Sequence, residues 1–168
     1  MKIYIGVKTI SAKPMSRLEY NSYRNWELPA DEDGSDEGYL VEYHDGGTAN
    51  HPGHSGYISW SPKAVFERAY RLTQGMVFGQ ALEHIKQGGK IARKGWNGKG
   101  MFVYLVPAAK YPATRNELGT MAEHSDDDGL VSYNAYMAIK NVDGTVSTWV
   151  PSVNDCLAED WELVNDKD

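Results

Sequence analysis

Cysteine is almost absent from this sequence, and so are the long apolar runs that membrane proteins need. Cys156 is the single cysteine among 168 residues, which excludes an internal disulfide and a zinc site built from several cysteines. We expect its side chain to be buried as a small apolar group. No apolar run is long enough to cross a membrane, and the opening residues MKIYIG lack the apolar region of a signal peptide. These absences predict a cytoplasmic protein that does not enter a membrane.

Acidic residues are missing from one part of a chain that is acidic as a whole. The net charge is -6, yet residues 84–116 contain no Asp or Glu. The cations of this window are Lys86, Lys90, Arg93, Lys94, Lys99, Lys110 and Arg115. The acidic total argues against a long nucleic acid as partner, because duplex binding needs many phosphate contacts. Cations, glycines and Trp96 within residues 91–100 instead suit a ligand with phosphates and a flat base.

The pattern of elements divides the chain near residues 72–75 into two small units, residues 1–71 and 76–168. In the first unit we expect strands over residues 2–10, 38–43 and 56–60. Ser16 and Glu19 form a capping-box pattern that predicts a short helix. A second helix is predicted with Ser61 as its N-cap before a proline. Four of its side chains recur at helical spacing and are expected to face a core: Val65, Phe66, Ala69 and Tyr70.

The second unit has a clearer pattern. A helix is predicted over residues 78–85 and ends at Gly88-Gly89, and a capping box at Ser152 predicts a second helix that continues through Ala158. The predicted strands are residues 91–94, 101–106, 133–140, 146–150 and 161–164. The polar loop 119–129 is expected to be exposed. The predicted fold class is α+β, with small antiparallel sheets and short helices.

Five residues of the second unit are candidates for ligand binding: Arg93, Trp96, Asn97, Trp149 and Asn154. A guanidinium can pair bidentately with a phosphate, and an indole can stack on a base. Asn97 shares a glycine-rich turn with Trp96, and Asn154 at a helix start can hydrogen-bond a base or ribose edge. The alternative for both tryptophans is a place in the core.

Other polar side chains have simpler explanations. Asp155 is expected to act in a capping box, and Asp160 and Trp161 are expected to be structural. His44, His51 and His54 lie in one glycine-rich loop, but their spacing matches no zinc motif. We therefore predict no metal site, no cofactor and no catalytic residue.

Three motifs occur together in the second unit: FGQAL at residues 78–82, ARKGWNGKGM at 92–101 and DCLAEDW at 155–161. With them the sequence resembles the phage-borne Thoeris anti-defence family, in its second type, over the carboxy-terminal half of the chain. One position departs from the family pattern, because Val77 stands where the family commonly has a hydroxyl helix cap. Loss of that cap weakens a helix start by ~1 kcal/mol.

The resemblance implies a sponge, which is a protein that binds a cyclic ADP-ribose isomer or a related cyclic nucleotide as an immune signal without cleaving it. It also implies a homo-oligomer, dimer or tetramer, with pockets between subunits. Residues 1–71 resemble an add-on of phage proteins. Two alternatives stay open. The first is a phosphodiesterase-like enzyme that degrades the signal, which would need a metal cluster or a base–nucleophile set. The second is an accessory protein that binds a host protein through its acidic amino-terminal half.

Overall fold

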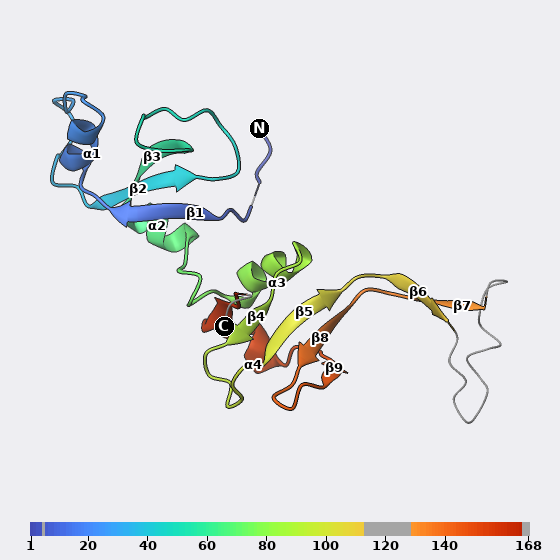
Figure 1. Ribbon diagram of the computed structural model, residues 1–168. Helices are drawn as coiled ribbons and strands as arrows, with labels where there is room; N and C mark the ends of the chain where they lie inside the picture. The colour runs from blue at the N-terminus through green and yellow to red at the C-terminus, as the bar shows by residue number, and fades with distance from the viewer. Residues whose placement is uncertain (5, 113–128, 166–168) are drawn as a thin grey trace. The chain divides into compact units, whose positions relative to one another are not determined.

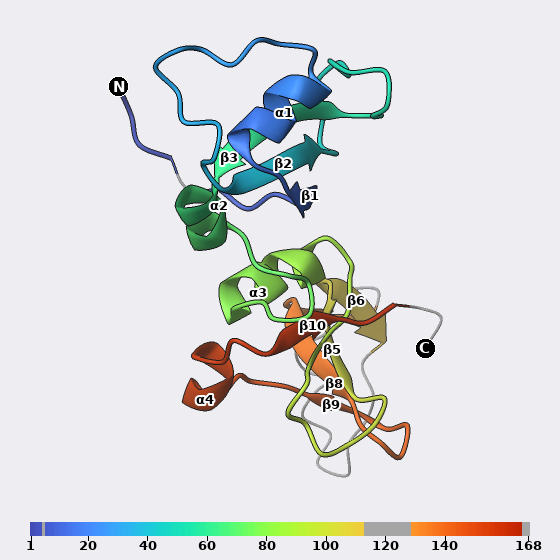
Figure 2. The same cartoon turned by 90° about the vertical axis from the view of Figure 1, so that its left-hand side faces the viewer.

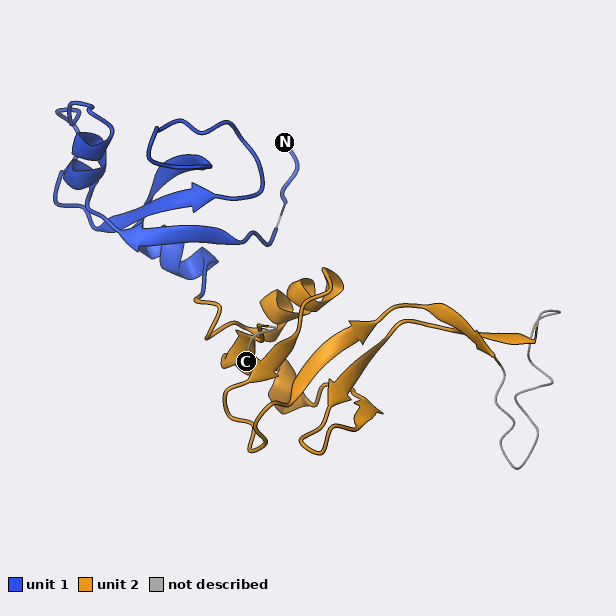
Figure 3. Cartoon of the chain, viewed as in Figure 1, with its two compact units in different colours: residues 1–71 blue, residues 72–168 orange. Residues whose placement is uncertain are grey.

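The chain forms two compact units, residues 1–71 and 72–168 (Figure 3). The computed structural model describes residues 1–4, 6–112 and 129–165. Each unit has its own antiparallel sheet and its own buried cluster, and the helices are short. This arrangement confirms the predicted α+β class. Within the described residues, no helix is long and apolar enough to cross a membrane.

Unit 1 is built on a three-stranded sheet with the order β1-β2-β3 (Figure 1). The strands are β1 (Ile10–Pro14), β2 (Gly38–Tyr43) and β3 (Tyr57–Pro62). Tyr39 of β2 stacks on Phe66 of α2 (Lys63–Ala69), whereas its neighbour Leu40 packs with Tyr20 of α1 (Arg17–Tyr23). Because successive side chains of a strand point to opposite faces, α1 and α2 cover opposite faces of this sheet.

Helix α1 starts at the predicted capping box. The backbone N–H of Glu19 donates to the Ser16 hydroxyl over 3.3 Å, and the Ser16 N–H donates to the Glu19 carboxylate over 2.7 Å. Tyr20 of this helix then joins Leu40 and Ile58 in the buried cluster of unit 1. The cap therefore fixes the helix in the place where its aromatic side chains meet the sheet.

Unit 2 contains a five-stranded antiparallel sheet with the order β10-β4-β5-β8-β9. Its strands are β4 (Ile91–Arg93), β5 (Phe102–Val106), β8 (Tyr136–Lys140), β9 (Val146–Thr148) and β10 (Trp161–Leu163). The last strand, β10, pairs with β4 and places Trp161 opposite Arg93. Beyond β5 and β8 the chain continues as a two-stranded ribbon of β6 (Ala109–Pro112) and β7 (Leu130–Tyr133) (Figure 1).

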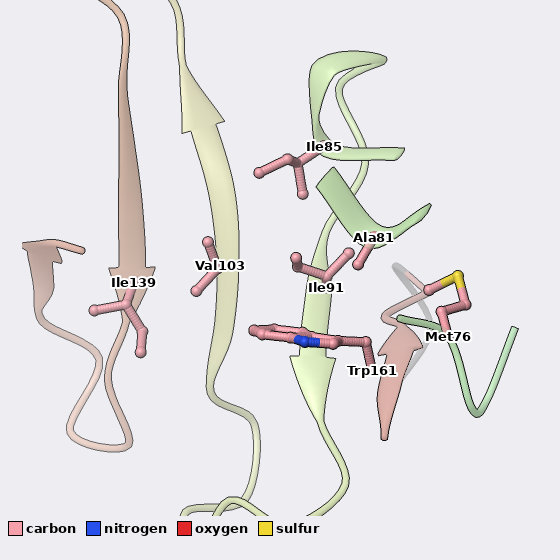
Figure 4. Close-up of a cluster of buried hydrophobic side chains, with 7 residues drawn as sticks. All are labelled: Met76, Ala81, Ile85, Ile91, Val103, Ile139 and Trp161. Atoms are coloured by element: carbon pink, nitrogen blue, oxygen red, sulfur yellow. The ribbon is translucent and has the colours of Figure 1, made fainter. Parts of the chain in front are cut away.

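Helix α3 (Phe78–Lys86) packs on this sheet and closes the core of unit 2. Its Ala81 and Ile85 are fully buried, as are Ile91, Val103 and Trp161 of the sheet (Figure 4). The short helix α4 (Val153–Cys156) joins β9 to β10 and contacts α3 (Figure 2). The core thus joins residues from both ends of unit 2, because the edge strand β10 contributes the buried Trp161 and the start of the unit contributes Met76.

The start of α3 lacks a side-chain cap, as the sequence indicated. Val77 occupies the N-cap position with an extended backbone, φ -78° and ψ 158°. Its backbone N–H donates to the Gln80 side-chain oxygen over 3.2 Å. Valine has no atom that can accept in return, so half of a capping box is present. At the other end Gly88 has φ +89°, a conformation that favours glycine.

Several element predictions for unit 1 were wrong. The first strand begins at Ile10 and continues to Pro14, because its partner β2 ends at Tyr43, the residue opposite Ile10. Ser61 lies in β3, and the N-cap of α2 is Pro62, which makes no side-chain hydrogen bond. None of the residues of α2 is fully buried, because this short helix contacts the sheet mainly by stacking Phe66 on Tyr39.

In unit 2, the strand predicted over residues 133–140 is divided between the end of β7 and the whole of β8. The strand predicted over residues 146–150 is shorter in the structure, because β9 ends at Thr148. The helix after Ser152 ends at Cys156 and not at Ala158. Cys156 is exposed, contrary to prediction, because the four-residue helix is too short to bury a full apolar face. Of the loop 119–129, all but Gly129 lies outside the described residues, and Gly129 is exposed.

Candidate functional site

Four aromatic rings connect the core of unit 2 to its surface. Trp96, in the turn after β4, has its ring centroid 5.7 Å from that of Trp161 and 6.4 Å from that of Trp149, both edge to face. Phe78 of α3 lies 5.4 Å from Trp161 and 6.3 Å from Trp149. We call these four residues the aromatic cluster. Trp161 is fully buried and the other three are partly exposed, so a ligand at the surface would meet rings that the core holds in place.

Arg93 is held by two carboxylates. Its Nε donates to Asp160 Oδ1 over 2.8 Å, and one terminal nitrogen donates to Asp155 Oδ1 over 3.0 Å. The hydrogen bond from Arg93 lowers the pKa of Asp160. Burial opposes ionisation of Asp155, but hydrogen bonds from Ser152 and Arg93 leave its pKa lowered. Arg93 therefore joins the end of β4 to α4 and to the turn before β10, and these two bonds leave other N–H groups of its guanidinium.

Asp160 also shapes the turn that carries Trp96. Its Oδ2 accepts a hydrogen bond from the backbone N–H of Gly95 over 3.0 Å, and its backbone carbonyl accepts from Lys94 over 3.0 Å. On the other side, the Trp161 indole N–H donates to the carbonyl of Asp155 over 3.0 Å. The aromatic cluster, the Trp96 turn and α4 are thus joined by one hydrogen-bond network.

The two candidate asparagines lie at exposed positions. Asn97 follows Trp96 in the turn, and Asn154 lies on α4. Lys94 and Lys99, in the same turn as Asn97, are also exposed. The end of this turn is fixed by the Lys140 ammonium, which donates to the Gly100 carbonyl over 3.2 Å. The turn therefore presents amide and ammonium groups next to the aromatic cluster.

The structure brings some of the candidate residues together directly and others through a neighbour. Trp96 and Trp149 are in ring contact. Arg93 reaches α4 through Asp155, the residue after Asn154. The sequence predicts a capping role for Asp155, and that cap is present, since the Ser152 N–H donates to its Oδ2 over 2.9 Å. Its second bond, to an arginine 62 residues away, leaves no signal in local spacing.

Two surface hollows of about 460 and 400 Å³ are lined by residues of unit 1, and no residue of the aromatic cluster lines either of them. We give them less weight than the cluster, because each is a shallow depression and neither gathers the aromatic and cationic groups of unit 2. Within the described part of the chain, no three His, Cys, Asp or Glu side chains are grouped so that they could hold a metal ion.

Comparison with known proteins places unit 2 in a family. The model of the Thoeris anti-defense 2-like domain matches residues 76–164, a range that contains the aromatic cluster and all five candidate residues. Thoeris anti-defense 2 of Bacillus phage SP01 is 38% identical over 91 residues, which cover 54% of this chain and 96% of that relative. The chain therefore belongs, through its carboxy-terminal unit, to the Thoeris anti-defense 2-like family.

Proposed function

We propose that this protein is a phage anti-defence sponge, which binds a cyclic ADP-ribose isomer or a related cyclic nucleotide and releases it unchanged. Membership of the Thoeris anti-defense 2-like family supports the anti-defence role. The observation that carries the binding role is the aromatic cluster, whose partly exposed tryptophans adjoin exposed cations and amides. The protein would act in the cytoplasm of the infected host.

In this proposal Trp96 stacks on the base and Trp149, which lies edge to face with Trp96, contacts the edge of the base. Asn97 and Asn154 hydrogen-bond its polar edges or the ribose. Stacking contributes about 1–3 kcal/mol per base, and hydrogen bonds to charged groups contribute about 1.5–3 kcal/mol each. A few such contacts in a preformed site reach nanomolar affinity, which corresponds to about -12 kcal/mol. Sequestration needs this tightness and no turnover.

Arg93 has a double task in the proposed site. It keeps its ion pairs with Asp155 and Asp160 and offers its remaining N–H groups to a phosphate. One guanidinium with two carboxylates carries a net negative charge, so the exposed Lys94 and Lys99 would supply the positive charge that phosphates need. A second copy of the chain would enclose the ligand in a homo-oligomer, dimer or tetramer.

The deciding experiment is a release assay. The protein is mixed with a cyclic ADP-ribose isomer below its stoichiometric amount, separated from free ligand, and then denatured by heat. Mass spectrometry of the supernatant should recover the intact ligand in proportion to the protein. A linear product in place of the intact ligand, which accumulates beyond one equivalent when the ligand is then supplied in excess, would show an enzyme and rule out the sponge. A panel of cyclic di- and trinucleotides in the same assay identifies the preferred ligand.

A further inference from the structure

The histidine loop of unit 1 forms a chain of side chains that the proposed function does not use. Tyr23 of α1 is hydrogen-bonded through its hydroxyl to His54 Nε2 over 2.9 Å. His54 Nδ1 is 2.7 Å from Glu42 Oε2 of β2. A hydroxyl, an imidazole and a carboxylate in this order match the geometry of a nucleophile, its base and the group that orients the base. The three residues lie far apart in sequence, so spacing gave no sign of them.

Glu42 is fixed as a carboxylate. Its Oε1 accepts hydrogen bonds from the backbone N–H groups of Ser55 and Gly56, each over 3.0 Å. The bond from His54, followed by the one from Gly56, lowers the pKa of Glu42 to about 2. An ionised carboxylate only accepts hydrogen bonds, so the proton of His54 lies on Nδ1. In the neutral ring, Nε2 then has a free lone pair directed at the Tyr23 hydroxyl.

The surroundings of Tyr23 suit a reactive phenol. The ring of His51 stacks on it, with centroids 4.3 Å apart, and the Lys13 ammonium lies 5.4 Å from its ring centroid. A Cβ atom at Gly53 would lie 3.2 Å from the Tyr23 hydroxyl, so a larger residue at this position would crowd the hydroxyl. Glu42 and His54 keep only 16% and 12% of their side-chain surface exposed, which holds them in place.

We propose that Tyr23 is a nucleophile, activated by His54 and Glu42, that attacks phosphate esters. The Tyr23 oxygen forms a bond to phosphorus while the bond from phosphorus to the leaving oxygen breaks. The phenol proton passes to His54 Nε2 and from there to the leaving oxygen. The products are a phosphate ester of Tyr23 and a free alcohol, and nothing is oxidised or reduced. Lys13 offsets the negative charge of the phosphate. This inference concerns unit 1 and does not rest on the proposed function of unit 2.

The first test compares two tyrosines within the unaltered full chain. A neutral fluorophosphonate is added, and the adduct on each tyrosine is followed by peptide mapping. Tyr57, which is 46% exposed, is the internal control. General-base assistance is worth about a hundredfold or more, so Tyr23 should be labelled at least roughly tenfold faster than Tyr57. Labelling of Tyr23 at or below the rate of Tyr57 would overturn the proposal. The hydrogen bonds among Tyr23, His54 and Glu42 would then have only a structural role.

Two variants then separate the roles. His54→Asn, in protein whose circular dichroism matches the parent, should reduce Tyr23 labelling to the Tyr57 rate, and an unchanged rate would contradict the base role. Lys13→Ala should slow the reaction with the anionic bis(p-nitrophenyl) phosphate and leave the reaction with the neutral fluorophosphonate unchanged. Equal effects on both reagents would contradict the assignment to phosphate esters. If His54→Asn does not fold, the comparison of Tyr23 with Tyr57 alone decides.

Discussion

At the scale of single residues, Trp96 is the most informative position of the proposed site. Replacement by alanine removes one stacking face, so the Kd of the cyclic nucleotide should rise at least tenfold, or about 1.4 kcal/mol. Because Trp96 also packs against the core, the melting temperature should fall as well. Trp96→Phe keeps a ring and should recover part of both. Calorimetry gives the affinity and a thermal melt gives the stability.

The matched control for this substitution is Trp26→Ala in unit 1. Trp26 is 53% exposed and lies outside the range matched by the family model, residues 76–164. Its loss should leave the affinity unchanged. If Trp96→Ala binds as tightly as the parent, the ligand site lies elsewhere. If the variant unfolds, Trp96 is primarily a core residue.

A second residue-scale prediction concerns acid stability and Asp160. The Arg93 hydrogen bond lowers its pKa in the folded state, so its contribution to stability is present above the unfolded value of about 3.9 and is lost as the pH falls through the lower folded value. Asp160→Asn should melt at a lower temperature than the parent at pH 7. The difference should shrink as the pH falls from about 5 to 3. A difference that stays constant across this range would show that the ion pair contributes no pH dependence.

The limits of sequence reasoning are also clearest for single residues. Trp96 and its basic, glycine-rich turn were visible as a local composition. The partners of Arg93 were not, because Asp155 and Asp160 lie 62 and 67 residues further along the chain and meet it only when β10 pairs with β4. The contacts among Tyr23, His54 and Glu42 could not be predicted either, because these residues also meet only in the folded unit. The sequence showed the histidines but not their partners.

At the scale of elements, the sequence predicted helix ends most accurately where a capping box or a glycine marks them. The capping boxes of α1 and α4 and the end of α3 at Gly88 all depend on neighbours within a few residues, and local chemistry was enough to find them. The first strand was misplaced because its limits depend on β2, more than two dozen residues away along the chain. The predicted burial of α2 was wrong for a related reason, since the sheet contacts this helix through Phe66 and Glu67, which both meet Tyr39, and leaves other predicted core residues of the helix exposed.

The incomplete cap of α3 gives an element-scale prediction. Val77 already has extended N-cap geometry, and Gln80 already accepts its N–H. Val77→Ser adds the missing acceptor and should raise the free energy of unfolding of unit 2 by about 0.5–1 kcal/mol. Ser152→Ala at the intact cap of α4 is the opposite control and should lower it by about 1 kcal/mol. Denaturant unfolding measures both. A less stable Val77→Ser protein would show that the partly buried valine packs more favourably than a hydroxyl caps.

At the scale of the whole molecule, the two units have separate cores and separate groups of functional interest. The aromatic cluster and all five candidate residues belong to unit 2. The chain of Tyr23, His54 and Glu42 belongs to unit 1. Contacts that begin at Leu72 belong to unit 2, since the Leu72 carbonyl accepts from Gly75 and the Thr73 carbonyl accepts from Leu163 of β10. A truncation that removes residues 1–71 therefore keeps the hydrogen bonds that hold the start of unit 2 in place.

This division predicts that a fragment of residues 72–168 folds, assembles and binds the cyclic nucleotide with the affinity of the full chain. Its core is complete, because Met76, α3 and β10 all lie within it. Light scattering gives the assembly state and calorimetry the affinity, with the fragment's Trp96→Ala variant as the negative control. Unit 1 would then contribute other chemistry or tune assembly. With about 70 residues it buries little surface, so it would be only marginally stable alone. A fragment that is folded and oligomeric but binds nothing would show that unit 1 supplies part of the pocket, and the separation of roles between the units would have to be given up.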